Sequence, residues 1–282
     1  MILPLLHIER EISGIIYCVL YADLQKIQYA IGRLCWCFGN QFICIYDFAL
    51  KSNAKTYKLC YNRQETDHVR QEETKMDSLC AIISGGEYTK LDKINEAEYI
   101  IACDRGFEYA KRENVQPNLV LGDFDSYSGA LPDNTEILKL PVEKDDTDTM
   151  SAARQALNRG YKNIRIYCAL GGRLDHLTAN IQTGAFIAQN GARCELIGRD
   201  AVIYIFSGGS IKLEEHRGWS LSLFALSNEV HGVCILGAKY TLEDATVTNT
   251  FPIGTSNEWR GDVEICAKDG ILAIISCRMP KD

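Results

Sequence analysis

The sequence lacks the features of membrane-spanning and nucleic-acid-binding proteins. Its longest early apolar run, Ile12 to Ala22, is interrupted by Ser13 and Gly14 and is too short to cross a bilayer. No basic n-region precedes that run, so we expect neither export nor membrane insertion. The net charge is −7, and no run of Arg and Lys could follow a phosphate backbone, which argues against a nucleic-acid partner.

The sequence also lacks the cysteine spacing that is typical of a disulfide framework or a zinc site. The twelve cysteines are irregularly spaced and none forms a CxxC pair, although Cys35 and Cys37 come closest. Several, including Cys103, Cys168 and Cys266, lie in apolar runs where a free thiol behaves as a small hydrophobe. The pattern favours a reducing cytoplasmic location over a disulfide framework or a zinc site.

Residues 1–75 differ from the rest of the chain. They show no sustained apolar period of 2 or 3.6, and they end in a charged stretch, Asn62 to Lys75. Met76 follows at once, ahead of a strongly apolar segment. We therefore treat 1–75 as an N-terminal extension of unassigned structure, and our hypothesis is that translation naturally starts at Met76. Mass spectrometry of the native protein tests this, because an N-terminus at Met1 would contradict it.

Residues 76–198 alternate short apolar strands with helical segments. The expected strands are Leu79–Ser84, Tyr99–Cys103, Leu119–Leu121, Glu136–Leu140 and Ile164–Ala169. The expected helices run from Asp104 to about Glu113, from about Asp146 to Arg159 and from Asp175 to Gln189. This alternation is typical of an α/β fold with a parallel sheet covered on both faces. No Gly-x-Gly-x-x-Gly follows the first strand, which excludes a Rossmann NAD-binding unit.

Residues 199–282 contain short strands and no helical pattern. The expected strands are Ala201–Phe206, Trp219–Ala225, Val230–Leu236, Ala245–Phe251, Val263–Ala267 and Ile271–Ser276. In one of them apolar residues alternate with Ser220 and Ser222, which gives one buried and one exposed face. We therefore expect a parallel-sheet nucleotide-binding domain followed by an antiparallel β-sandwich or barrel domain.

Two carboxylates follow the strand that starts at Leu119. Asp123 and Asp125 are two positions apart, so in an extended chain they would leave the same face. Two carboxylates held that close repel each other unless a cation lies between them. Mg²⁺ suits such a pair together with substrate phosphates. Taken alone, the segment could also be a polar turn, since Gly, Asp and Ser are common turn residues.

Further polar motifs follow other strands. Asp104 follows one, Lys144-Asp-Asp-Thr-Asp148 another and Gly171-Gly-Arg-Leu-Asp-His176 a third. Open parallel sheets bind ligands beyond the carboxyl ends of their strands, so we expect these residues to converge there. Capping a helix needs one carboxylate, whereas this chain supplies three within four residues. The pattern therefore favours a metal-dependent phosphoryl-transfer site.

Four motifs taken in order resemble those of the thiamine pyrophosphokinase (thiamine diphosphokinase) family: Asp104-Arg-Gly106, Gly122-Asp-Phe-Asp-Ser126, Lys144-Asp-Asp-Thr-Asp148 and Gly171-Gly-Arg-Leu-Asp-His176. The resemblance covers residues 77–282 and none of residues 1–75. It implies an α/β domain that binds Mg-ATP, a β-rich domain that helps to bind thiamine, and a homodimer with active sites at the subunit interface. The implied reaction transfers the diphosphoryl group of ATP to the hydroxyl of thiamine and releases AMP.

The resemblance also assigns roles to individual residues. The implied metal and phosphate cluster is Asp104, Asp123, Asp125 and Asp148, and the last three are the implied catalytic residues. The implied nucleotide contacts, besides Asp104, are Asp145, Thr147, Arg173 and Asp175. On the thiamine side the implied residues are Tyr240, Ser256 and Asn257. Tyr240 stands where some members carry a stacking Trp, and its π-face could hold the thiamine cation.

Two other functions remain open at this point. A diphosphokinase for another alcohol, such as a hydroxymethyl pterin, would use the same acidic cluster. A non-catalytic nucleotide or thiamine sensor could be built on the same scaffold. The sequence also leaves open the number of metal ions, the residues of the dimer interface, the Asp that acts as general base and the roles of Lys144 and His176.

Overall fold

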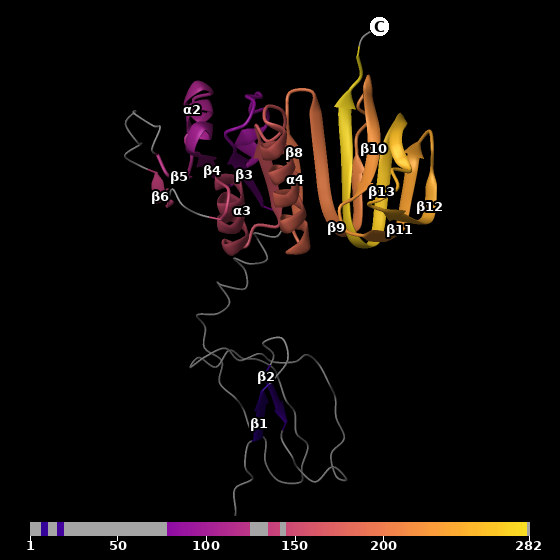
Figure 1. The fold of residues 1–282 in the computed structure, drawn as a ribbon, viewed down its shortest axis with the longest axis horizontal. Coiled ribbons are helices and arrows are strands. Elements are labelled where there is room, and N and C mark those ends of the chain that lie inside the picture. Colours follow the sequence, from indigo (N-terminus) through magenta and orange to yellow (C-terminus); the bar gives the residue numbers. More distant parts are fainter. Residues whose placement is uncertain (1–6, 11–15, 20–77, 125–134, 142–144, 281–282) are drawn as a thin grey trace, which may run out of the picture. The chain divides into compact units, whose positions relative to one another are not determined.

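The computed structural model describes residues 7–10, 16–19, 78–124, 135–141 and 145–280 (Figure 1). The chain divides into two compact units, Met1–Val69 and Arg70–Asp282. In the first unit, strands β1 (His7–Arg10) and β2 (Ile16–Val19) pair antiparallel. Within the described ranges, no helix combines the length and the apolar character that a bilayer crossing requires.

A mixed sheet of eleven strands runs through the second unit. The parallel strands, in spatial order, are β8 (Arg193–Ile197), β7 (Asn163–Tyr167), β3 (Leu79–Ile83), β4 (Tyr99–Cys103), β5 (Leu119–Gly122) and β6 (Glu136–Lys139). The antiparallel strands are β9 (Ala201–Leu213), β13 (Gly254–Arg278), β11 (Glu229–Ala238), β12 (Leu242–Thr248) and β10 (Trp219–Ala225). β9 joins the two parts because it pairs antiparallel with β8.

Helices cover both faces of the parallel part. They are α2 (Asp104–Arg112), α3 (Asp148–Asn158) and α4 (Leu174–Gln189), and a short 3-10 helix spans Ile94–Glu96. Ile82 of β3 shares a buried cluster with Ala152 of α3 and Ile187 of α4. The next residue, Ile83, packs instead with Phe107 of α2. Successive strand residues point to opposite faces, so α2 lies on one face and α3 and α4 lie on the other.

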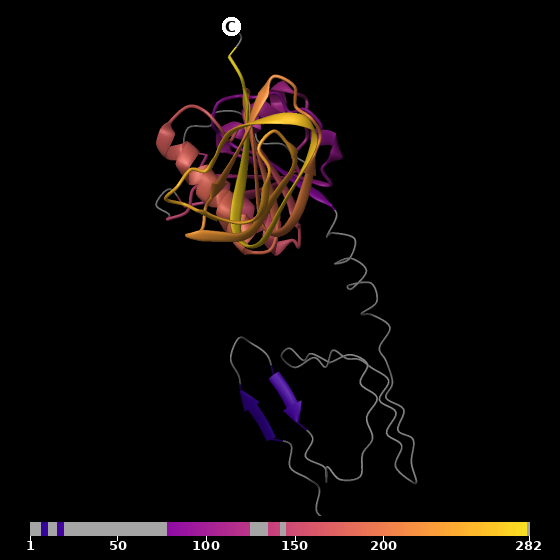
Figure 2. The same ribbon diagram turned by 90° about the vertical axis from the view of Figure 1, so that its right-hand side faces the viewer.

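The β-rich part closes around a core of its own. β10 lies between two stretches of β13, because Leu221 of β10 is opposite both Ser276 and Asn257. Leu221 belongs to a buried cluster that also contains Val233 and Ile265. Figure 2 looks onto these strands from the β-rich end. The first and the last residues of the long strand β13 therefore both pair with β10.

The expected α/β part followed by a β-rich part is confirmed at this coarse level. Strand β8 is missing from the prediction, and the predicted strands Val263–Ala267 and Ile271–Ser276 are one strand with a register shift between them. The strand expected at Ala245–Phe251 lies at Leu242–Thr248. The finer division of the chain into domains stays a prediction.

Candidate functional site

Two of the predicted carboxylates follow neighbouring parallel strands. Asp104 is the first residue of α2, directly after β4, and Asp123 directly follows β5. A Cβ placed on Gly122 would lie 3.0 Å from the Cβ of Asp104. Asp104 therefore packs against the main chain that leads into Asp123, and glycine at position 122 makes this approach possible. Both carboxylates are half-buried.

The extended geometry assumed for the Asp123–Asp125 pair is wrong at the residue between them. Phe124 has a φ of 57°, in the left-handed region, so the chain turns there and the rule for extended neighbours does not apply. Asp125 and Lys144 lie outside the described residues. Among the residues described, no group of three or more His, Cys, Asp or Glu side chains is arranged to hold a metal ion.

The start of α3 lies beside the end of β3. Ser84, which follows β3, forms a buried 2.8 Å hydrogen bond between its Oγ and Oγ1 of Thr149. Asp148 is half-buried in the first turn of α3, where a carboxylate is favoured by the positive end of the helix dipole. The first turn of α3 is thus brought to the edge at which β3, β4 and β5 end. This edge offers carboxylate oxygens, which suit a hard cation such as Mg²⁺.

Thr147 caps α3. Its Oγ1 accepts a hydrogen bond from the main-chain N–H of Met150 at 3.1 Å. The helix was expected from about Asp146, and it begins instead after this cap. Asp146 forms an ion pair with Arg154, 2.8 Å from Nε to Oδ2, while Asp145 is exposed. Thr147 therefore has a structural role in addition to the phosphate contact predicted for it.

The loops after β3 and β7 meet where the strand order reverses. A Cβ on Gly171 would lie 2.3 Å from Oε2 of Glu87, so the two loops touch. Strands β4 to β6 extend the sheet to one side of β3, and β7 and β8 extend it to the other. Ligands of open α/β sheets bind at such a switch point.

An open depression of about 670 Å³ lies at the N-terminus of α4. Its lining residues are Arg173, Leu174, Asp175, Thr178, Ala179 and Gln182. Arg173 donates two hydrogen bonds to Asp175, at 3.1 Å and 2.5 Å. The hydrogen bond from Arg173 is the main reason that the pKa of Asp175 is below its usual range. The N–H of the next residue, His176, also donates to Asp175 at 3.0 Å.

Sequence reasoning missed the residue that anchors α4. Asn180 is buried, and its Nδ2 donates to the carbonyl of Ala169 at 2.7 Å, just after β7. This bond fixes the helix against the loop that leads into it. The sequence signal for Asn180 was its position on the apolar face of a helix. A buried polar side chain needs a hydrogen-bonding partner, so such a position predicts a structural contact.

The thiamine-side residues Tyr240 and Asn257 lie together in the β-rich part. The side chain of Asn257 is buried, with 5% exposure, whereas Tyr240 is 60% exposed. Oδ1 of Asn257 accepts from the N–H of Tyr240 at 2.9 Å, and Nδ2 donates to the carbonyl of Tyr240 at 2.7 Å. Ser256 is exposed with a φ of 59°, and its N–H donates to Oγ of Ser222 at 3.0 Å.

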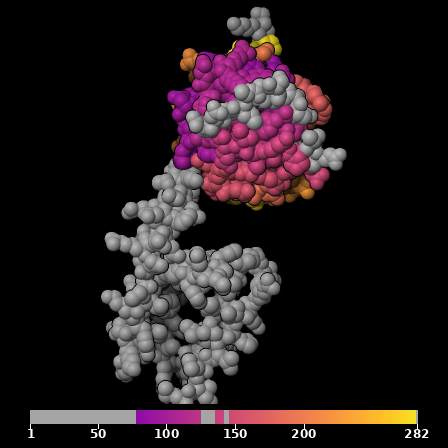
Figure 3. All heavy atoms as spheres, turned by 90° about the vertical axis from the view of Figure 1, so that its left-hand side faces the viewer, coloured from indigo at the N-terminus to yellow at the C-terminus, as the bar shows by residue number. Residues whose placement is uncertain are grey.

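We call the strand ends that carry Asp104, Asp123 and Asp148 the acidic edge, and we call Tyr240, Ser256 and Asn257 the Tyr240 region. The strands that carry the acidic edge and those that carry the Tyr240 region lie in different parts of the sheet (Figure 1). Five strands, β4, β3, β7, β8 and β9, separate β5 from β13. Figure 3 shows the end that carries β5 and β6, where residues of the α/β part form the surface. The structure therefore places Asp104 beside the chain that leads into Asp123, and Tyr240 beside Asn257. These two pairs lie in different parts of the sheet within one chain.

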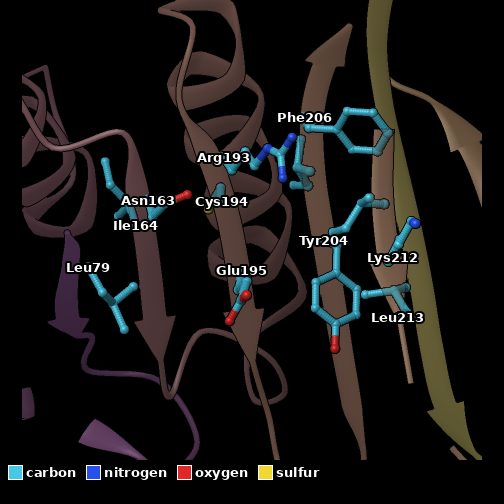
Figure 4. Close-up of a pocket in the computed structure, with 12 residues that line it drawn as sticks. Leu79, Asn163, Ile164, Arg193, Cys194, Glu195, Tyr204, Phe206, Lys212 and Leu213 are labelled. Carbon is cyan, nitrogen blue, oxygen red and sulfur yellow. The ribbon is translucent and has the colours of Figure 1, made fainter. Parts of the chain in front are cut away.

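A separate cavity of about 200 Å³ lies at the opposite edge of the parallel strands (Figure 4). Leu79, Asn163 and Arg193, which begin β3, β7 and β8, contribute to its lining. The predicted site residues follow the carboxyl ends of strands, so this cavity does not belong to the candidate site.

Comparisons with known proteins match both parts of the second unit. The family model described as thiamin pyrophosphokinase, catalytic domain, matches residues 91–196. The model described as thiamin pyrophosphokinase, vitamin B1 binding domain, matches residues 210–272. Together they span more than half of the chain.

Individual relatives agree with these matches. The thiamine pyrophosphokinase of Bacillus subtilis (strain 168) is 26% identical over 187 residues, which are 63% of this chain and 87% of the relative. The crystal structure of thiamine pyrophosphokinase from Bacillus subtilis has a TM-score of 0.63 at 25% identity, covering 71% of this chain and 99% of that one. Thiamin pyrophosphokinase from Candida albicans shares the fold, with a TM-score of 0.58 at 17% identity and coverages of 71% and 89%.

Proposed function

The chain belongs to the thiamin pyrophosphokinase family, and we propose that it transfers the diphosphoryl group of ATP to the hydroxyl of thiamine, giving thiamine diphosphate and AMP. The observation that carries this function is the match to both family models in order along the chain. The catalytic match contains the acidic edge, and the vitamin B1 match contains Tyr240 and Asn257. We keep 76–198 as the ATP- and Mg²⁺-binding domain and 199–282 as the thiamine-binding domain.

For the metal we propose Asp104, Asp123 and Asp148, together with Asp125 of the same motif. Support comes from the packing of Asp104 beside the strand end that leads into Asp123, and from the oxygen-only set of donors. Mg²⁺ bound there would neutralise charge on the phosphate oxygens. An aspartate of this edge, with Asp148 the first candidate, would accept the proton of the attacking hydroxyl.

For the nucleotide phosphates we propose the depression at the start of α4. The first N–H groups of a helix and its dipole favour an anion. Arg173 is largely exposed and now bonded to Asp175, so it would exchange that carboxylate for a phosphate oxygen. We place Asp145 and Thr147 on the other side of the nucleotide, at the start of α3.

For thiamine we propose the exposed ring of Tyr240, which can accept a cation on its π-face. Lys239 lies 5.3 Å from the centre of this ring, but its Nζ pairs with Glu258 at 2.5 Å. The pairing neutralises a charge that would otherwise repel the thiamine cation. Ser256, and Asn257 through its hold on Tyr240, would complete the pocket.

We further propose a homodimer whose active sites lie between subunits. Six strand spacings of about 4.8 Å place β13 on the order of 29 Å from β5 along the sheet. In-line transfer needs the reacting atoms roughly 3–3.5 Å apart. A second copy that presents its Tyr240 region to the acidic edge would close this gap. A cytoplasmic location, inferred from the irregular cysteine spacing, is part of the same proposal.

Incubation of the purified protein with Mg-ATP and thiamine tests the function. We expect AMP and thiamine diphosphate to appear together on chromatography and to disappear with EDTA. A hydroxymethyl pterin, offered in place of thiamine, should give no AMP. AMP without thiamine diphosphate would contradict the proposed acceptor, and ATP that remains unconsumed would contradict the enzyme assignment.

A further inference from the structure

Two cysteines face each other across the strands that carry the Tyr240 region. Cys234 of β11 and Cys266 of β13 are directly opposite in the antiparallel pairing of these strands. Directly opposite residues of such a pair have Cα atoms about 4.5 or about 5.5 Å apart. A disulfide needs a Cα separation of about 4.4–6.8 Å, so the pair meets this requirement in either pairing type.

The two thiols also lie on the same side of the sheet and share a partner. Sγ of Cys234 is 3.8 Å and Sγ of Cys266 is 3.9 Å from the carbonyl oxygen of Gly232. Their strand neighbours Val233, Ile235 and Ile265 point into the buried core, so the cysteines lie on the outer face. Both are half-buried and both are free thiols. A small oxidant can therefore reach them from solvent.

 The five other cysteines within residues 78–280 differ in this respect. Cys80, Cys103, Cys168 and Cys194 are buried, and Cys277 is half-buried opposite Ala201 rather than opposite a second thiol. Burial raises the pKa of the Cys80 thiol to about 12 and that of the Cys168 thiol to about 11. Thiolates are the reactive form, so these buried residues are poor competitors for an oxidant.

We propose that Cys234 and Cys266 form a dithiol site that a low-molecular-weight disulfide, such as glutathione disulfide, oxidises to a cross-strand disulfide. This site goes beyond the proposed function and does not depend on it. In a reducing compartment the pair stays as two thiols, and a more oxidising thiol pool closes the bridge reversibly.

The reaction proceeds by two thiol–disulfide exchanges. The thiolate of one cysteine attacks a sulfur of glutathione disulfide, which forms a mixed disulfide and releases one glutathione as its thiolate. The second cysteine, after losing its proton, attacks the protein sulfur of that mixed disulfide and releases the second glutathione. Two protein thiols are thereby oxidised, and one glutathione disulfide is reduced to two glutathione molecules.

The pH dependence of closure follows from the environment of the pair. Burial, followed by the hydrogen bond with Cys234, raises the pKa of the Cys266 thiol. The nearby Glu264 raises the pKa of Cys266 further. The positive charge that faces the pair is Lys268, which interacts electrostatically with Cys234. Closure is therefore expected to be slow at neutral pH and faster at pH 9.

The bridge would close a loop that contains the whole Tyr240 region. Tyr240 and Asn257 both lie between positions 234 and 266, and Ala238 pairs with Trp259 further along the same two strands. A disulfide stabilises mainly by restricting the unfolded chain, and its effect grows with the length of the loop. Oxidation should therefore raise the melting temperature of the protein, by about 5–10 °C.

The test uses the full chain, fully reduced and then equilibrated with glutathione disulfide at pH 8. We expect peptide mapping under non-reducing conditions to find the Cys234–Cys266 cross-link, and the melting temperature to rise and return with dithiothreitol. Cys234→Ser and Cys266→Ser should each lose the cross-link and the rise. Cys277→Ser, a matched change at a half-buried cysteine of β13, should keep both.

Two results would overturn the proposal. One is a wild-type protein in which both residues stay free, or carry glutathione singly, at equilibrium. The other is a melting-temperature rise that persists in both serine variants, since a different bridge would then be responsible. Mapping of the wild-type protein decides the matter even if a serine variant fails to fold.

Discussion

Asn257 holds the main chain of Tyr240 from both sides, accepting from its N–H at 2.9 Å and donating to its carbonyl at 2.7 Å. The same Oδ1 also accepts from the N–H of Glu258 at 2.9 Å. A buried side chain thus fixes the position of an exposed aromatic ring. The ring is available to a ligand, while its main chain is not free to move.

Replacing Asn257 with Ala should therefore harm both stability and thiamine binding. The change leaves main-chain groups near Tyr240 without their partners, which should cost about 1–3 kcal/mol of unfolding free energy. A loss of about 1.4 kcal/mol in thiamine binding would raise the KM for thiamine tenfold. Denaturant unfolding and steady-state kinetics measure the two effects. Asn249→Ala, at an exposed asparagine, is the control and should change neither.

Asp123→Asn should remove activity and leave the fold intact. The change replaces a charged ligand of the proposed Mg²⁺ with a neutral amide, and so weakens the binding of the cation that neutralises the transferring phosphates. A loss of electrostatic stabilisation of this kind should lower kcat by about 10²–10³-fold. Asp125→Asn should behave in the same way. The readouts are AMP release and circular dichroism, and Asp146→Asn is the control because Asp146 pairs with Arg154 at the surface. Near wild-type rates in both Asp123→Asn and Asp125→Asn would refute the metal assignment.

Thr147→Ala should separate capping from phosphate binding. Loss of the cap on Met150 should lower the free energy of unfolding by about 1 kcal/mol. Thr147→Ser keeps a hydroxyl and should keep the stability. If Thr147 also contacts ATP, the Ala variant should show a higher KM for ATP while the Ser variant does not. Equal KM values in wild type and both variants would leave Thr147 as a helix cap alone.

His231 should make stability depend on pH. Its Nδ1 lies 2.8 Å from Asp269 and its Nε2 lies 3.3 Å from Glu229. The hydrogen bond with Asp269 is the main reason that the pKa of His231 is raised, and the same bond lowers the pKa of Asp269. Because the folded-state pKa of His231 is the higher one, its contribution is full below the unfolded value of about 6.5 and is lost as pH rises through the folded pKa.

Two measurements check this expectation. An NMR titration should place the pKa of His231 above that of an exposed histidine. The difference in unfolding free energy between wild type and His231→Gln should be larger at pH 6 than at pH 9. A difference that grows with rising pH would contradict the assigned sign.

Strands β3, β4 and β5 could be predicted because they are short and almost entirely apolar. Strand β8 was missed because Arg193 and Glu195 interrupt its apolar residues. In the fold Glu195 is paired with Arg165 of the neighbouring strand, a contact that only the sheet order creates. The apolar pattern of a single segment does not reveal an ion pair between two strands.

Strand β13 was divided in the prediction because Asp269-Gly270 is a common turn signal. In the fold Gly270 has a φ of 74° and the pairing with β9 shifts between Ala267 and Ile271, so the same residues form an irregularity within one strand. The left-handed conformation of Phe124 was not predicted, because bulky residues rarely adopt it. The placement of Asp104 and Asp123 at the ends of β4 and β5 was predictable, because the carboxyl ends of parallel strands share one side of a sheet.

The pairing of β8 with β9 determines whether the α/β part could fold as a separate fragment. Ile197 pairs with Val202 across the predicted boundary, and Ile203, Ile205 and Ala273 from the β-rich part lie in the same buried cluster as Ile82. A fragment that stopped at residue 198 would present β8 as an uncovered edge and would lack part of its own interior. The two halves therefore form one folding unit, even though each would handle a different substrate.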